Sequence, residues 1–293
     1  MKKIGMIGIG LMGHGIASNI VKHGYPLTVM EHAGNQPLDS LLAQGVKTVT
    51  TPSALGAESE IILLCVTGAP QVEAVLTGAD GLVAGLAPGS IVIDCSTSIP
   101  SSTQKLAQLV SAAGSTLIDA AMTRTPKEAA EGRLNLLVGS DPRTFETVKP
   151  VLDCFAENIH HMGDVGAGHQ MKLLHNYVSL GTVTVIAEAA ACARRSGIGP
   201  EEFVEVLHKG GGWGAALERL KPYLLNGGDT SNLRFTLSNA EKDLGYYTTY
   251  AADTHADHTV AAAIRQTIAQ ACHAGHGEEH MPNMVGFIAD RKV

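Results

Sequence analysis

Three glycines near the start of the chain, Gly8, Gly10 and Gly13, follow a short apolar run and precede a pattern with helical spacing. A G-x-G-x-x-G pattern that ends a strand and opens a helix is typical of a dinucleotide-binding turn. The first glycine permits the bend, the second lets a pyrophosphate approach the backbone, and the third lets the helix pack on the strand. The helix N-terminus then offers N–H groups to the phosphates. A glycine-rich turn without a ligand is the alternative, which this context disfavours. The turn residues assigned to the cofactor are Gly8, Ile9, Gly10, Leu11, Met12 and Gly13.

Composition excludes several classes of protein. The chain has 293 residues, enough for two domains, and its formal net charge of −7 argues against a nucleic-acid-binding surface. No run approaches about 18 consecutive apolar residues, so no membrane span is expected. Glycines interrupt the first apolar run, which argues against a signal peptide. The cysteines are widely spaced and form no C-x-x-C pair, which favours reduced thiols in a cytoplasmic protein.

The first half of the chain alternates short apolar runs with helical patterns. Strands are predicted over residues 3–7, 27–31, 61–66, 91–95, 116–119, 135–138 and 158–161. Helices are predicted over residues 11–22, 37–44, 70–76, 100–113 and 142–154, several with a proline near the first turn. Strands that alternate with helices of this length predict an α/β fold with a mostly parallel, doubly wound Rossmann sheet.

After Asp164 the pattern changes. Residues 167–196 predict one long helix that ends with basic residues and Gly197, and the following residues up to 288 predict helices only. We therefore expect a Rossmann domain over residues 1–164 and an all-α domain over residues 165–293, joined by the long helix. A pocket between two such domains is the default ligand site.

An acidic residue, Glu31, ends the second predicted strand. A carboxylate about 20 residues beyond the glycine motif accepts hydrogen bonds from the adenosine ribose. It also repels a 2′-phosphate, and no Lys or Arg follows before Lys47. The sequence thus favours NAD over NADP, with Glu31 and His32 assigned to the cofactor. NADP stays open, because His32 and Asn35 offer polar groups to a phosphate.

Polar residues also follow two other predicted strands. Ser96 and Thr97 come directly after one of them, and the carboxyl ends of strands face the ligand crevice in sheets of this kind. They are expected to bind the nicotinamide ribose or carboxamide, and Val66 and Thr67, at the end of another strand, are assigned to the cofactor as well. The alternative is that Ser96 or Ser98 caps the helix that follows.

Lys172 and Asn176 lie four residues apart and share a face of the long predicted helix. A lysine whose pKa is lowered to about 7–8 by desolvation can exchange a proton with a substrate hydroxyl at neutral pH. The amide of Asn176 can fix that hydroxyl by hydrogen bonding. Without further context, a solvated surface lysine is the simpler interpretation.

Several motifs in the same order resemble one known family. They are Gly8-x-Gly10-x-Met12-Gly13, Asp94-Cys95-Ser96-Thr97, the segment from Asp119, Gly166-x-Gly168-x-x-x-Lys172-x-x-x-Asn176, and Lys242-Asp243-Leu244. Over essentially its whole length the chain resembles the β-hydroxyacid dehydrogenases, the group of 3-hydroxyisobutyrate dehydrogenase and tartronate semialdehyde reductase. The resemblance implies that Lys172 is the catalytic acid/base and that Asn176 binds substrate. It also implies that Lys242 reaches the cofactor near the nicotinamide, Asp243 helps to place Lys172, and Thr97 contacts the nicotinamide ribose.

The chain departs from this family pattern at two places. The family usually has two asparagines after the lysine, and His175 replaces the first. The family's substrate loop commonly has the sequence D-A-P-V-S-G-G and cradles a carboxylate with backbone N–H groups. Here Thr123 stands for the serine, Arg124 replaces a glycine, and Thr125 follows. A guanidinium at that position offers a bidentate grip on a carboxylate, phosphonate or sulfonate. The Arg-Thr pair is similar to that of the sulfolactaldehyde reductases in this family. A surface arginine near a turn is the alternative.

Two further features carry less weight. The segment His276-Gly-Glu-Glu-His280 matches a zinc-protease spacing. Its glycines begin a helix poorly, however, and no third ligand is evident, so a polar connection and no metal are expected. Trp213, the lone tryptophan, follows three glycines and is assigned to the wall of the substrate pocket, with a core position as the alternative.

Together these features predict an NAD-dependent dehydrogenase of a small, anionic 3-hydroxy acid or its semialdehyde. Lys172 is the expected acid/base, Thr123, Arg124 and Thr125 are expected to hold the acid group, and Asn176 to orient the reacting oxygen. A homodimer or homotetramer is implied by the resemblance. A sulfolactaldehyde-type reductase and a threonine or serine dehydrogenase are alternatives within the family. A non-catalytic dinucleotide sensor is the alternative from another class.

Overall fold

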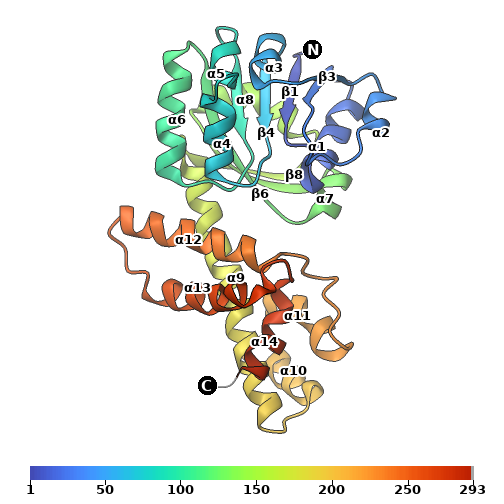
Figure 1. The fold of residues 1–293 in the computed structure, drawn as a ribbon, viewed down its shortest axis with the longest axis vertical. Helices are drawn as coiled ribbons and strands as arrows, with labels where there is room; N and C mark the ends of the chain where they lie inside the picture. The colour runs from blue at the N-terminus through green and yellow to red at the C-terminus, as the bar shows by residue number, and fades with distance from the viewer. Residues whose placement is uncertain (292–293) are drawn as a thin grey trace. The chain divides into compact units, whose positions relative to one another are not determined.

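The computed structural model describes residues 1–291, which form two compact units, one ending at Lys172 and one beginning at Leu173 (Figure 1). The strands of the first unit are β1 (Ile4–Ile7), β2 (Leu27–Met30), β3 (Lys47–Val49), β4 (Ile61–Leu64), β5 (Ile91–Asp94), β6 (Thr116–Thr123), β7 (Leu134–Gly139) and β8 (Ala156–Gly163). Its helices are α1 (Leu11–Lys22), α2 (Asp39–Leu42), α3 (Pro52–Glu58), α4 (Ala69–Thr77), α5 (Leu82–Gly85), α6 (Pro100–Ala112), α7 (Pro126–Glu131) and α8 (Pro142–Leu152). Each strand and helix predicted in this half is present within a few residues of its expected bounds.

The strands form one sheet with the order β3-β2-β1-β4-β5-β6-β7-β8. All neighbours pair in parallel except β6 and β7, which are antiparallel. The predicted Rossmann sheet is therefore confirmed. The chain winds outward on one side of β1 and resumes with β4 on its other side, so the loops after β1 and β4 diverge. Ligands bind at such a switch point, beyond the carboxyl ends of the strands.

Both faces of this sheet are covered, because successive residues of a strand point to opposite faces. In β4, Ile61 and Leu63 join the core that lies under α1, α7 and α8, whereas Ile62 and Leu64 join the core under α3, α4, α5 and α6. Strands that are apolar on both faces are typical of buried parallel sheets. This is why the sequence shows them as continuous apolar runs.

Four short elements were not predicted: β3, α3, α5 and α7. They span three to seven residues, which is too short for a hydrophobic period to be visible. Two of them, α3 and α7, carry a local helix-start signal: a threonine followed by a proline in the first turn. The Thr51 hydroxyl accepts a hydrogen bond from the Ala54 N–H, and Pro52 follows Thr51 in the first turn.

The long helix α9 (Ala167–Arg195) begins in the first unit and continues into the second. It ends with Arg194 and Arg195, and Gly197 follows at φ +77°, as the sequence predicted. The domain boundary expected at residues 164/165 stays a prediction, since the division by contacts falls inside α9. No helix in the described part of the chain is long and apolar enough to cross a membrane.

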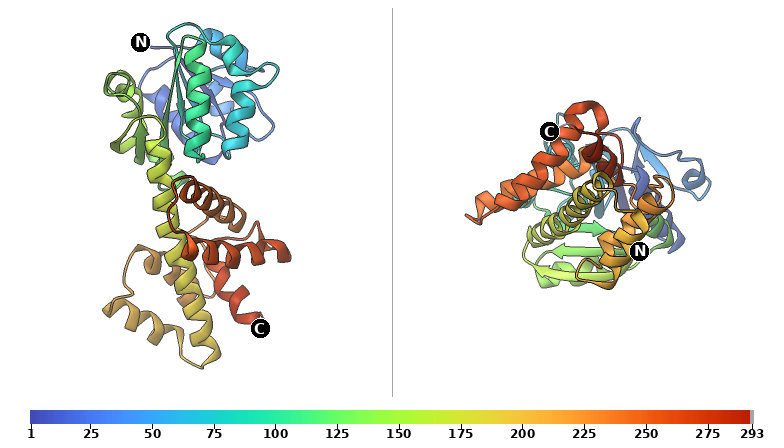
Figure 2. Two further views of the ribbon diagram at one scale, coloured as in Figure 1. Left: turned by 90° about the vertical axis from the view of Figure 1, so that its left-hand side faces the viewer. Right: turned by 90° about the horizontal axis from the view of Figure 1, so that it is seen from below.

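Over its described residues the second unit is helical, as predicted, apart from its loops and an isolated bridge between Thr236 and His280. Its further helices are α10 (Pro200–Lys209), α11 (Ala215–Leu225), α12 (Leu237–Asp253), α13 (Thr259–Ala271), a π-turn over Cys272–His276, a 3₁₀ turn over Met281–Asn283, and α14 (Met284–Asp290). Helices α11 to α14 pack on α9 through an apolar core that includes Val183, Leu220 and Leu244 (Figure 2).

Candidate active site

The three glycines of the β1–α1 turn are glycine for different structural reasons. Gly8 has φ +95°, and a Cβ there would lie 2.2 Å from the carbonyl oxygen of Cys65. A Cβ at Gly13 would lie 1.9 Å from the carbonyl oxygen of Gly8. These two glycines are needed by the fold itself. A Cβ at Gly10 would meet no atom of the chain within 4 Å, so the open space above Gly10 suits a group from outside the chain.

The N-terminus of α1 is suited to bind an anion. No side chain caps the helix at Gly10, so none competes for the N–H groups of its first turn. Leu11, in that turn, is 67% exposed although it is apolar. An uncapped helix N-terminus beside an unfilled glycine position fits the pyrophosphate of a dinucleotide.

The loop after β2 is tied to this turn by Asn35, which the sequence suggested only as a possible phosphate ligand. The Asn35 Oδ1 accepts a hydrogen bond from the Ile9 N–H at 3.2 Å, and its Nδ2 donates to the Met30 carbonyl at 3.0 Å. The Gln36 N–H also donates to the Ile9 carbonyl, at 2.7 Å. Asn35 is therefore engaged in holding the two loops together.

A cavity of about 550 Å³ lies beside the same loop. This volume is within the usual range of ligand pockets, about 300–1,000 Å³. The predicted residues Glu31 and His32 line it, and none of its lining residues is Lys or Arg. The lining residues are Glu31, His32, Ala33, Asn35, Gln36, Leu38 and Thr50. The cavity fits the adenosine end of a cofactor whose pyrophosphate lies at the glycine turn.

The structure brings the ends of β4 and β5 together. The buried Ser96 accepts a hydrogen bond from the Val66 N–H on its Oγ at 3.0 Å and donates its own N–H to Asp94 Oδ1 at 2.9 Å. Ser96 therefore fixes Val66, while Thr67 is exposed and Thr97 half-buried. The capping alternative is wrong, because the residue before α6 is Ile99 and no side chain caps that helix.

Asp119 on β6 holds the beginning of α9. Its Oδ1 accepts the Gly166 N–H at 2.6 Å, and its Oδ2 accepts the His169 N–H at 2.7 Å. Burial raises the pKa of the Asp119 carboxyl, while the neighbouring His169 and these two N–H donors oppose the rise. A carboxylate at a helix N-terminus is also favoured by the helix dipole. The turn that carries Lys172 is thereby fixed to the sheet.

Asn176 follows Lys172 by one helical turn and is only 6% exposed. Its Nδ2 donates to Asp243 Oδ2 at 2.6 Å, and its Oδ1 lies 3.0 Å from His175 Nδ1. His175, the departure from the family pattern, thus supports the neighbouring amide. Asp243 is buried, and its Oδ1 lies 3.2 Å from Lys242 Nζ. The second unit therefore joins Asn176, Asp243 and Lys242 in one polar group.

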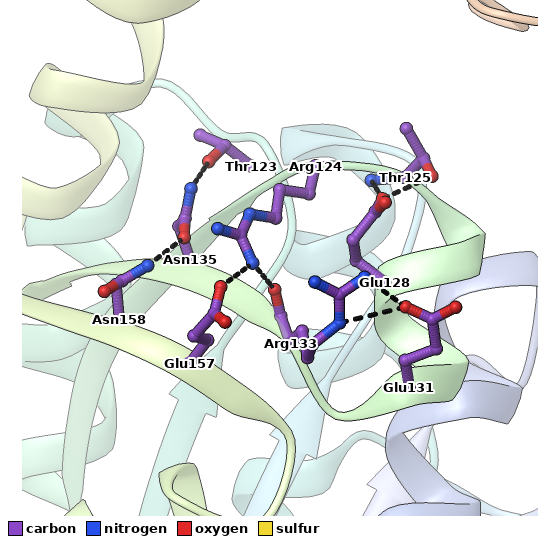
Figure 3. Close-up of polar contacts among 9 residues, drawn as sticks. All are labelled: Thr123, Arg124, Thr125, Glu128, Glu131, Arg133, Asn135, Glu157 and Asn158. Carbon is purple, nitrogen blue, oxygen red and sulfur yellow. Dashed lines mark hydrogen bonds and ion pairs between the residues drawn. The ribbon is translucent and has the colours of Figure 1, made fainter.

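The loop after β6 contains the three predicted substrate residues (Figure 3). Arg124 has φ +81°, a conformation that favours glycine, so an arginine there carries backbone strain. Its guanidinium donates to the carboxylate of Glu157 and to the carbonyl of Arg133. Figure 3 shows the Arg124 side chain extended toward these two partners. Sequence reasoning missed Glu157, which lies 33 positions away.

The two threonines of this loop are engaged as well. Thr123 Oγ1 accepts a hydrogen bond from Asn135 Nδ2 at 3.1 Å. Thr125 donates both its N–H and its hydroxyl to Glu128, at 3.0 and 2.6 Å, and so fixes the start of α7. These hydrogen bonds hold the pKa of Glu128 below its usual range, chiefly through the Thr125 hydroxyl.

Two remaining predictions concern the second unit. Trp213 is 64% exposed, so the core alternative is wrong. Its ring meets the His208 ring edge-on, with the ring centroids 6.3 Å apart. Its assignment to the pocket wall stays a prediction. His276 Nδ1 lies 2.7 Å from Glu279 Oε1. In the described residues, no three His, Cys, Asp or Glu side chains are grouped to hold a metal ion.

Comparisons with known families match both units. The model of the NAD-binding domain of 6-phosphogluconate dehydrogenase matches residues 3–163. The model described as the NAD-binding domain of NADP-dependent 3-hydroxyisobutyrate dehydrogenase matches residues 166–288. The two matches meet near the start of α9.

Individual relatives agree with these models. The chain is 32% identical over 246 residues to 2-(hydroxymethyl)glutarate dehydrogenase of Eubacterium barkeri, covering 83% of this chain and 80% of that one. It is 29% identical over 279 residues to 3-sulfolactaldehyde reductase of Escherichia coli K12, covering 95% and 93%. The structure of Mycobacterium tuberculosis 3-hydroxyisobutyrate dehydrogenase with L-serine has the same fold, with a TM-score of 0.88, 24% identity, and coverage of 98% and 99%. The chain thus belongs to the β-hydroxyacid dehydrogenase family of NAD(P)-dependent oxidoreductases, whose members act on a CH–OH group.

Proposed function

We propose that the chain transfers a hydride between NAD and C3 of a small, anionic 3-hydroxy acid or its semialdehyde, with Lys172 as general acid/base. The observation that supports this most directly is the pair on α9. Lys172 precedes Asn176 by one turn, and the Asn176 amide is held by Asp243. Two polar groups so placed can share one substrate oxygen.

In this mechanism Lys172 Nζ takes the hydroxyl proton during oxidation and returns it during reduction. Asn176 donates a hydrogen bond that orients the reacting oxygen, and the Asp243 carboxylate limits the rotation of its amide. Lys242 and Thr97 would hold the nicotinamide end of the cofactor, and Asp243 would also help to place Lys172. The nicotinamide, when bound, supplies the acceptor or donor of the hydride.

The acid group of the substrate is assigned to Thr123, Arg124 and Thr125, with Trp213 at the pocket wall. Arg124 favours a second candidate within the family, a reductase of a sulfonated aldehyde, because a guanidinium suits a strong tetrahedral anion. The E. coli relative, named 3-sulfolactaldehyde reductase, supports including that class. L-serine and L-threonine represent the 3-hydroxy amino acid alternative.

The test is reduction of NAD⁺ and NADP⁺ on matched 3-hydroxy compounds with a carboxylate, a sulfonate or an amino acid group, and the reverse reaction with the aldehydes. We expect turnover that depends on an acid group. A chain that binds NAD⁺ in calorimetry but turns over none of these compounds in either direction is a dinucleotide sensor, and the proposal fails.

Cofactor preference supplies one prediction. Glu31 is acidic and lines a cavity without Lys or Arg among its lining residues, which supports NAD. The double variant Glu31→Ser, His32→Arg should shift the ratio of kcat/KM toward NADP⁺ by about 10- to 100-fold, since a charged hydrogen bond contributes roughly 1.5–3 kcal/mol. Steady-state kinetics with both cofactors measures the ratio. A parent enzyme that already prefers NADP⁺ contradicts the NAD assignment.

A cytoplasmic homodimer or homotetramer completes the proposal. All five cysteines are free, which suits a reducing compartment: Cys65, Cys95, Cys154, Cys192 and Cys272. The oligomer follows from family resemblance alone, and sedimentation velocity of the purified chain tests it.

A further inference from the structure

The buried side chain of His169 lies in the first turn of α9, three positions before Lys172. Its side chain is 0% exposed, and both ring nitrogens have partners from other parts of the first unit. Nδ1 lies 2.8 Å from Thr103 Oγ1 on α6, and Nε2 lies 3.1 Å from the carbonyl oxygen of Ser96. The imidazole therefore bridges α9, α6 and the loop after β5.

The partner of Nε2 requires a hydrogen on that nitrogen. A carbonyl oxygen only accepts hydrogen bonds, so Nε2 carries a hydrogen and donates it to Ser96. The backbone of His169 is bound too, because its N–H donates to Asp119 Oδ2. The side chain is thus anchored to the loop after β5 through Ser96, and the backbone to β6 through Asp119.

These contacts connect the two halves of the proposed chemistry inside one compact unit. Ser96 belongs to the loop assigned to the nicotinamide end of the cofactor, and Lys172 is the proposed acid/base one turn along α9. We propose that His169 is a positioning residue, which sets the distance between the Lys172 turn and the nicotinamide loop through its Nε2–H bond to the Ser96 carbonyl. This inference rests on the proposed function of Lys172.

The alternative is that His169 only stabilises the fold, and the chain offers a matched control. Asn19 on α1 is also buried, and its Nδ2 donates to the carbonyl oxygens of Ala129 and Ala130, at 3.0 and 3.1 Å. It is a buried polar bridge in the same unit, and no role in catalysis is assigned to it. Asn19→Ala therefore reports the effect of losing such a bridge on stability alone.

The experiment compares His169→Ala, His169→Gln and Asn19→Ala. A shift of about 1 Å in a catalytic group costs on the order of 10²-fold in rate, so kcat of His169→Ala should fall about 10- to 100-fold. Its Kd for the reduced cofactor, measured by calorimetry, should stay within about threefold, because no direct cofactor contact is removed. His169→Gln keeps an N–H donor near the Nε2 position and should regain most of the loss.

A second readout separates positioning from stability. With a reduced cofactor deuterated at the transferred hydrogen, the isotope effect on kcat should rise in His169→Ala, because hydride transfer becomes slower than the other steps. Asn19→Ala should lower Tm but leave kcat and the isotope effect unchanged. If His169→Ala does not fold, kcat and its isotope effect are measured on His169→Gln and Thr103→Val instead. A small loss of kcat is expected in each of these two variants.

The outcomes distinguish this inference from the function on which it rests. Loss of activity in Lys172→Ala, with His169→Ala unchanged in kcat and lowered only in Tm, overturns the positioning role alone. A folded His169→Gln that is as slow as His169→Ala also overturns it, since the Nε2–H bond would then not be the cause. If the parent enzyme turns over no substrate, the proposed function fails, and the positioning role fails with it.

Discussion

Replacing Lys172 by alanine should lower kcat by about 10²- to 10⁴-fold, the usual contribution of a general acid/base group. The Kd for NAD⁺ should change little, because the residues that fit the adenosine and pyrophosphate lie in the β1–α1 turn and the loop after β2. The fold should be retained, since Lys172 is only half-buried. Steady-state kinetics and calorimetry on the same preparation give both numbers.

Lys149 provides the control for this prediction. It lies on α8, its side chain is 43% exposed, and its Nζ pairs with the Asp153 carboxylate at 2.8 Å. Exposed pairs contribute about 0–1 kcal/mol to stability, so Lys149→Ala should keep both its fold and its turnover. Activity of Lys172→Ala within a few-fold of the parent would remove Lys172 from the mechanism and favour the solvated-lysine interpretation.

The elements that could be predicted are those with local signals. The glycine turn is visible in the sequence, because Gly8 needs a positive φ and Gly13 lies too close to the backbone to carry a side chain. The buried strands appear as short apolar runs because both faces of the sheet are covered. The end of α9 is marked by two arginines and Gly197. In each case the sequence signal lies within a few neighbouring residues.

The parts that could not be predicted depend on distant partners. β6 continues to Thr123 because it pairs antiparallel with β7, and nothing within residues 116–119 shows where that pairing ends. The sequence alone indicates no role for His169, because a single histidine in a helix has no local signature. Its meaning comes from Thr103 and from the Ser96 carbonyl, 66 and 73 positions away.

The capping alternative for Ser96 illustrates the same limit. A serine shortly before a helix is a common cap, and local preference could not reject it. In the fold, the Ser96 hydroxyl oxygen instead accepts a hydrogen bond from the Val66 N–H, at the end of the neighbouring strand. The same contact ties the two loops that were assigned to the cofactor.

The contact between Arg124 and Glu157 bears directly on the prediction that Arg124 binds the acid group of the substrate. Its ion pair with Glu157 is partly exposed, with side-chain exposures of 28% and 44%. A pair of this kind contributes only about 0–1 kcal/mol, so a substrate anion can replace the Glu157 carboxylate at little cost. On the proposed function, Arg124 would exchange its contact with Glu157 for a contact with the substrate anion.

Arg124→Met should lower kcat/KM for a substrate with a distal carboxylate or sulfonate by about 10- to 100-fold, because a charged hydrogen bond to a desolvated anion contributes roughly 1.5–3 kcal/mol. The matched analogue with an amide in place of the anion should be affected much less. Methionine, like arginine, has a Cβ at this φ of +81°, so the substitution removes the guanidinium without relieving the backbone strain. The ratio of kcat/KM for the two members of the substrate pair is the measured quantity.

Glu157→Gln supplies the opposite expectation and makes the test decisive. Removing the competing carboxylate should raise kcat/KM for the anionic substrate by about two- to fivefold, the equivalent of up to 1 kcal/mol, and leave the amide analogue unchanged. Arg124→Gly relieves the backbone strain while it removes the guanidinium, so it should match Arg124→Met on the anionic substrate. If Arg124 serves only to tie β8 to the loop, both Arg124→Met and Glu157→Gln should lower Tm by similar amounts and leave the substrate ratio untouched. That result would end the anion-grip hypothesis and return the recognition of the acid group to Thr123, Thr125 and the backbone N–H groups of the loop.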